Sequence, residues 1–220
     1  MRELQWGLWH WQAPHPDWTS AEPWPQLVSS YAMDDGARLV LFDPLDVPDE
    51  LLELAAEREA MVVLTAPWHE RDTESLVARL GDVPVFVPPP DTADDLVRKF
   101  GIPREQTGRG SPDVAWLLAG DRSNARLVAP GDQLPSGIDV LCGREENDLV
   151  LWIESRRAVI VGDTLVDYGK GLQVNERLRG GVTRKDVIAR LQPLLSRPVE
   201  LVLPAHGAPT DLSALVRALR

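Results

Sequence analysis

Three short apolar runs in this chain each end in side chains that can titrate or bind a metal. The first run leads into an imidazole, a guanidinium and two carboxylates, the second into a Gly-Asp pair, and the third into a Pro-Ala-His-Gly sequence. Because open α/β sheets gather functional groups at the carboxyl ends of buried strands, this pattern constrains the fold strongly. The runs and their polar ends are residues 61–64 with 69–72, 159–161 with Asp163, and 201–203 with His206.

The remaining segments alternate between strand and helix patterns. Their order predicts two packed sheets with helices outside each sheet, and no linker interrupts it, so residues 1–220 are predicted to form one domain. Strands are expected at residues 28–33, 38–42, 61–64, 83–87, 114–118, 126–128, 138–141, 149–153, 158–161 and 199–203. Helices are expected at residues 48–60, 73–80, 92–100 and 183–195, and after Asp211.

The charge balance limits the classes of partner. The 220 residues carry a formal net charge of −11, which repels phosphate backbones and anionic membranes. We therefore expect a small-molecule substrate or ligand, with no nucleic acid and no membrane as partner. The one cysteine, Cys142, excludes an internal disulfide, and the chain start lacks the apolar segment of a secretory signal, so a cytoplasmic location is expected. The oligomeric state is left open.

The three motifs resemble those of the metallo-β-lactamase superfamily. Residues 65–71, Thr-Ala-Pro-Trp-His-Glu-Arg, are similar to the family's Thr-His-x-His-x-Asp-His signature. The pair Gly162-Asp163 resembles the strand end that carries a metal-bridging aspartate, and residues 204–207 resemble a Pro-x-His-Gly ligand motif. The resemblance implies an α/β four-layer αβ/βα sandwich of two mixed sheets, and it covers residues from about 31 to the C-terminus.

The departures from the family pattern fall on its metal ligands. The three histidines of the first metal site are replaced by Ala66, Trp68 and Arg144, none of which has a lone pair to give to zinc. The second site keeps three side chains that can bind a metal. Those side chains are Glu70, Asp163 and His206, while Arg71 stands at the fourth position. A binuclear hydrolase is therefore not expected.

The first functional hypothesis is a hydrolase with a single divalent metal. Glu70, Asp163 and His206 would bind zinc, manganese or iron and leave a position open for water. His69 and Asp72 lie three residues apart and share a face if that turn is helical. Either one is a candidate catalytic residue, as general base, additional ligand or orienting group.

The second hypothesis is a relative without metal. Arg71 and Arg144 would occupy the place of the metal and pair with Asp163 or Glu70. The cavity would then bind an anionic ligand or a partner, and the protein would be a pseudoenzyme or a scaffold. A third possibility, independent of the family, is an ordinary α/β binding domain in which Asp163 and His206 are turn and capping residues.

Overall fold

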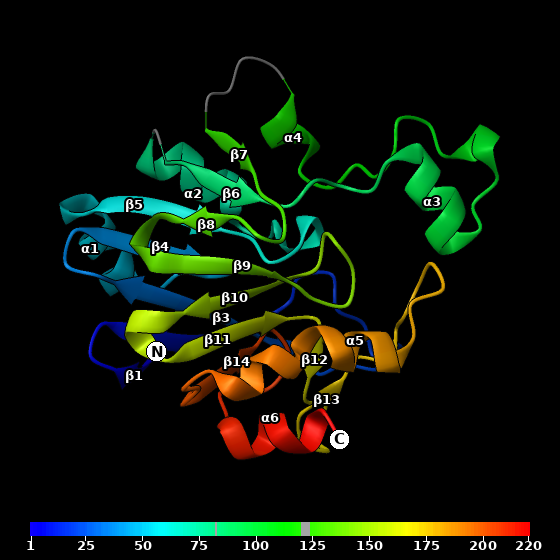
Figure 1. The fold of residues 1–220 in the computed structure, drawn as a ribbon. Helices are drawn as coiled ribbons and strands as arrows, with labels where there is room; N and C mark the ends of the chain where they lie inside the picture. The colour runs from blue at the N-terminus through cyan, green and yellow to red at the C-terminus, as the bar shows by residue number, and fades with distance from the viewer. Residues whose placement is uncertain (82, 120–123) are drawn as a thin grey trace.

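The computed structural model describes residues 1–81, 83–119 and 124–220, and within them two large sheets lie face to face (Figure 1). The first sheet has the strand order β1-β2-β3-β4-β5-β6-β7. Its strands are β1 (Arg2–Gln5), β2 (Leu8–Pro14), β3 (Leu27–Asp34), β4 (Arg38–Phe42), β5 (Glu59–Val63), β6 (Val85–Val87) and β7 (Ala125–Leu127).

The first sheet is mixed because its connections change along the chain. Strands β1 to β4 pair antiparallel, and the β3–β4 turn passes through Gly36 at a φ of +93°, a conformation that glycine adopts without strain. Strands β4 to β7 pair parallel, since helices α1 (Asp49–Glu57) and α2 (Thr73–Leu80) supply crossovers. Their polar ends therefore meet at one edge of the sheet.

The second sheet has the order β14-β11-β10-β9-β8. Strand β11 pairs parallel with β14, and the other pairs are antiparallel, so this sheet is mixed as well. A small hairpin of β12 and β13 follows β11, and helices α5 (Arg184–Leu191) and α6 (Leu212–Ala218) cover the outer face. The strands are β8 (Gln133–Leu134), β9 (Ile138–Cys142), β10 (Leu149–Ile153), β11 (Ala158–Gly162), β12 (Leu165–Val166), β13 (Gln173–Val174) and β14 (Leu201–Pro204).

Three apolar layers hold the sandwich together. The middle layer lies between the sheets and includes Phe42, Leu151 and Ile160, each at most 1% exposed. A second layer packs α1 and α2 on the first sheet, and a third packs α5 and α6 on the second. Inward and outward residues alternate along β10, as expected for a strand that is buried on both faces. The predicted four-layer αβ/βα sandwich is confirmed.

Hydrogen bonds join the two sheets at the end where the polar groups gather. The Ser29 amide donates to the Ala205 carbonyl at 2.8 Å, and the Tyr31 hydroxyl donates to the Pro204 carbonyl at 2.8 Å. The Leu149 amide donates to the Thr65 carbonyl at 2.7 Å. These bonds satisfy buried polar groups and fix the relative position of the two strand edges.

Two segments extend beyond the layers on this side. Helix α3 (Ala93–Phe100) stands apart from both sheets in Figure 1 and has no buried residue. It begins at Thr92 with a capping box to Asp95 and ends at Gly101 in the left-handed conformation. The loop between β13 and α5 approaches it, because a side-chain carbon added to Gly180 would lie 2.8 Å from the Arg98 guanidinium.

The expected strand at residues 114–118 is wrong. Ala115–Leu118 form the short helix α4, which starts after Val114 with a φ of +50°. Within the described ranges, the structure contains no helix that is long and apolar enough to cross a membrane.

Candidate functional site

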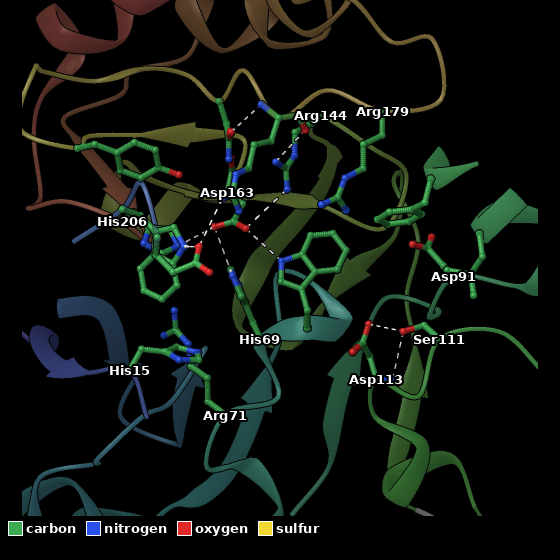
Figure 2. Close-up of a pocket in the computed structure, with 18 residues that line it drawn as sticks. His15, His69, Arg71, Asp91, Ser111, Asp113, Arg144, Asp163, Arg179 and His206 are labelled. Carbon is green, nitrogen blue, oxygen red and sulfur yellow. Dashed lines mark hydrogen bonds and ion pairs between the residues drawn. The ribbon is translucent and has the colours of Figure 1, made fainter. Parts of the chain in front are cut away.

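A cavity of about 410 Å³ opens at the joined edge of the two sheets (Figure 2). Its walls come from the ends of β5, β11 and β14, from the N-terminal segment, from α3 and from the loop before α5. Among the residues that the sequence singled out, His69, Arg71, Arg144, Asp163 and His206 line it. Glu70 and Asp72 do not line it.

Asp163 lies at the centre, directly after β11. Gly162 before it has a φ of +49°, and a side-chain carbon there would approach the Thr65 hydroxyl to 2.9 Å, so glycine is required for the turn. One carboxylate oxygen, Oδ2, accepts a 3.1 Å hydrogen bond from Trp68 Nε1 and lies 3.6 Å from the Arg144 guanidinium.

The other oxygen of Asp163, Oδ1, lies 3.4 Å from His69 Nε2 and 3.3 Å from His206 Nε2. Burial alone would raise the pKa of Asp163, but the charge of His69 and the hydrogen bonds of both imidazoles bring it well below its usual value. The carboxylate is therefore ionised and surrounded by nitrogen groups of the protein itself.

His69 lies between two carboxylates. Its Nδ1 is 3.1 Å from Asp43 Oδ2 and 2.9 Å from the Thr65 hydroxyl, which itself donates to Asp43 at 2.6 Å. Burial would lower the pKa of His69, but Asp43 and then Asp163 outweigh it and raise the pKa to about 9. This direction favours an imidazolium at neutral pH, with Nδ1 facing Asp43 and Nε2 facing Asp163, and such a ring is poorly suited to act as a general base.

Arg144 is a buried cation between two acids. It follows Gly143, where a side-chain carbon would collide with the Asp148 carbonyl, so only glycine fits at this strand end. The Arg144 Nε donates to Asp148 Oδ2 at 2.8 Å, and a terminal nitrogen faces Asp163. Burial raises the pKa of Asp148 to about 6, although Arg144 opposes that shift. The guanidinium thus neutralises charge on the side of the cavity where the family has a histidine.

Arg71 also faces the cavity, but it binds backbone. One terminal nitrogen donates to the carbonyls of Ser29 at 2.9 Å and Asp43 at 2.6 Å. No carboxylate lies within 4.0 Å of its guanidinium in residues 1–81, 83–119 and 124–220. The expected ion pair of Arg71 with Asp163 or Glu70 is therefore wrong for the described part of the chain.

Glu70 and Asp72 are bound elsewhere. The Glu70 carboxylate accepts from the Val114 amide at 2.8 Å and from Trp116 Nε1 at 3.0 Å, so it fixes the segment that leads into α4. Asp72 accepts from the Asp46 amide at 2.7 Å, outside the cavity. Both carboxylates thus stabilise local structure next to the site.

His206 follows β14 and has aromatic neighbours. Its ring centre is 4.9 Å from that of Trp24 and 5.8 Å from that of Tyr168, both in edge contact. Its Nδ1 is buried and makes no hydrogen bond to any described residue. The imidazole is thus held by packing and by Asp163.

The side chains around Asp163 do not fit the predicted single-metal site. Glu70 is turned away from Asp163 and His206, so the predicted ligand trio does not assemble. The nearest groups include an indole and a guanidinium, which are donors only, and an imidazolium with both nitrogens facing acceptors. No set of three or more His, Cys, Asp or Glu side chains suited to a metal ion occurs in the described residues.

Asp43 contacts His69 in the structure but was not among the site residues predicted from the sequence. It follows β4 in an Asp-Pro pair at a φ of +45°, and it binds Thr65 and His69. The Asp-Pro pair after an apolar run was the only local signal for it.

Comparisons with known proteins agree with the fold. No protein-family model and no curated protein matches the sequence. Among solved structures, the DIM-1 metallo-β-lactamase aligns with a TM-score of 0.64 at 14% identity, over 99% of this chain and 93% of that chain. A metallo-β-lactamase superfamily protein of Sulfolobus tokodaii, ST1585, aligns with a TM-score of 0.63 at 14% identity, over 97% and 84%.

A third structure, TTHA1623 in a di-iron-bound form, aligns with a TM-score of 0.56 at 25% identity, over 88% of this chain and 94% of that chain. These similarities extend over most of the chain and therefore include both sheets and the helices outside them. This chain therefore has the metallo-β-lactamase fold.

Proposed function

We propose that the cavity is a metal-independent binding site for a small anionic molecule. The observation that carries this proposal is Arg71, a partly buried guanidinium that lines the cavity and has no carboxylate within 4.0 Å among the described residues. A cation away from bulk water is stabilised by an anion, and a planar guanidinium suits a carboxylate or a phosphate.

The acids of the cavity support the proposal because most of them already have partners. Asp163 has Arg144 and His69 beside it, and Asp91 is bound to Lys99 at 2.6 Å. Asp113 accepts a hydrogen bond from the Ser111 hydroxyl. The acids therefore oppose an incoming anion less than their number implies. The pKa of His15, which also lines the cavity, is lowered by burial and then by the charge of Arg71. The second of these causes indicates that the Arg71 charge acts at that end of the cavity.

Hydrolysis with a single bound metal is the competing hypothesis, and the fold favours it by analogy only. It requires ligands other than the trio with Glu70. The two hypotheses differ in one measurable property, because metal-independent binding survives a chelator and metal-dependent activity does not.

The test measures binding of inorganic phosphate and of benzoate to the purified protein by calorimetry, with and without EDTA, together with the metal content of the protein. We expect binding of at least one probe that EDTA leaves unchanged. Arg71→Gln is expected to weaken it roughly tenfold or more, because a charged hydrogen bond is lost. Arg71→Lys keeps the positive charge but loses the planar guanidinium with its paired donors, so it should weaken binding less than Arg71→Gln.

Arg79→Gln is the matched control, since Arg79 is exposed on α2 and does not line the cavity. Circular dichroism of each variant establishes that it is folded. Stoichiometric metal whose removal abolishes binding would overturn the proposal, and so would probes that bind neither before nor after EDTA.

A further inference from the structure

Four arginines line the cavity, and two of them are matched by acids. Arg144 lies beside Asp148 and Asp163, and a terminal nitrogen of Arg177 is 3.4 Å from the Glu22 carboxylate. The other two, Arg71 and Arg179, have no carboxylate within 4.0 Å in the part of the chain that the structure describes. The cavity therefore presents two unmatched guanidinium groups.

Arg179 is held by an aromatic ring. Its guanidinium carbon is 4.3 Å from the ring centre of Phe100, at the end of α3. The close approach of Gly180 to Arg98 brings the loop before α5 against that helix. This contact orients the guanidinium at the cavity without neutralising its charge.

The two unmatched arginines lie on different sides of the cavity. In Figure 2, Arg71 lies near His15, below Asp163 in the view, whereas Arg179 lies above it and to the right, near Arg144. Arg71 comes from the segment between β5 and α2, and Arg179 from the loop between β13 and α5. The two groups therefore face the cavity from different sides.

The space between them suits an organic body. The volume of about 410 Å³ is in the range of sites for organic ligands and exceeds what a bare phosphate fills. Trp24, Trp68, Phe100 and Tyr168 all line the cavity, and aromatic walls favour a flat apolar group.

We infer that the ligand carries two separated negative groups, one at Arg71 and one at Arg179, joined by a flat apolar body. This inference rests on the proposed anion site and names the class of its ligand, an aromatic dianion.

The experiment compares benzoate with two longer aromatic dianions, terephthalate and biphenyl-4,4′-dicarboxylate, by calorimetry. We expect at least one dianion to bind roughly tenfold more tightly than benzoate, since it gains a second charged contact. Arg179→Gln should remove that gain, so it should weaken the dianions more than benzoate. Arg71→Gln should weaken all three probes.

Arg217→Gln, an exposed arginine of α6, is the control for the loss of one positive charge. Equal affinity for benzoate and both dianions overturns the inference but leaves the anion site intact. An equal loss of benzoate and dianion binding in Arg179→Gln also overturns it. If neither benzoate nor phosphate binds the wild-type protein, the proposed function itself fails.

Discussion

At the scale of single residues, nitrogen groups surround Asp163, and Trp68 and Arg144 among them stand at positions where the family has histidine ligands. Asp163 lies at the end of β11, with Trp68, His69, Arg144 and His206 within 3.6 Å of its carboxylate. Each contributes a nitrogen, and together they stabilise the charge that burial would otherwise make unfavourable. The charge that remains unmatched is positive, on the arginines, and this suits an anion.

A second residue, His10, supports the same edge and predicts a pH dependence of stability. Its Nε2 is 2.9 Å from the Ser29 hydroxyl, and its ring stacks on Tyr31 at 5.1 Å. Burial, and then the charge of Arg2, lower the pKa of His10 to about 4.

Because this pKa is below the unfolded value of 6.5, the stabilisation is fully present above pH 6.5 and is lost as the pH falls toward 4. We expect His10→Gln to reduce the fall in the free energy of unfolding over this range by roughly 1 kcal/mol, since the ring is partly exposed. Urea unfolding of both proteins at several pH values measures it. Parallel pH curves would contradict the assignment.

The sequence predicts the part of the site that lies at strand ends, but not the contacts between distant segments. Asp163, His206 and Arg144 meet because each follows a strand of one sheet, and strand ends can be located from apolar runs. The partner of Glu70 could not be predicted, because the Val114 amide belongs to a segment more than 40 residues away. Asp43 was missed for a related reason, since only its three-dimensional contact with His69 distinguishes it from an ordinary turn residue.

At the scale of elements, α3 differs from the helices of the outer layers. It has no buried residue, yet Leu96 and Phe100 line the cavity. Lys99 as a whole is partly exposed, but its side chain is only 7% exposed and connects α3 to the body. Its Nζ is 2.6 Å from Asp91, 2.7 Å from Glu145 and 3.0 Å from the Asn147 amide oxygen. The helix is thus positioned by charge, not by apolar packing.

Lys99→Met should release this helix. The change leaves two buried carboxylates without a cation, which costs about 3 kcal/mol of local stability. Hydrogen exchange of the α3 amides is expected to accelerate while the sheets remain protected. Arg98→Met, on the same helix, removes an exposed pair with Asp95 and a surface contact near Gly180 but no buried charge, and should have little effect. Similar exchange in both variants would refute the role of Lys99.

Helix ends were predicted better than the segment around α4. The expected helix at 183–195 is α5 followed by a 3-10 helix at Gln192–Ser196, because Pro193 lacks the amide that a regular helix needs. The run at 114–118 is short and apolar, and such runs do not distinguish a strand from a buried helical turn. Glu70 accepts hydrogen bonds from Val114 and Trp116 in this segment, and these contacts join residues that are far apart in the sequence.

At the scale of the whole molecule, the middle apolar layer couples the two sheets. Leu151 of β10 is fully buried within it. Leu151→Ala should therefore lower the free energy of unfolding by about 2–5 kcal/mol. If residues 1–220 form one domain, as the sequence predicts, tryptophan fluorescence and circular dichroism will report a single coincident transition. Leu127→Ala, at a 58% exposed position on β7, should change stability by less than about 0.5 kcal/mol.

The hydrogen bonds between the sheets have a further consequence for which molecules can enter. Ser29, Tyr31 and Thr65 join the strand edges that carry His69 and His206, so these edges cannot separate without breaking bonds between buried groups. The part of the cavity lined by α3 and the loop before α5 is held differently, through the Lys99 side chain and the contact of Arg179 with Phe100. We therefore expect the joined strand edges to limit the width of a bound molecule near Asp163 more strictly than α3 and the loop before α5 limit its length.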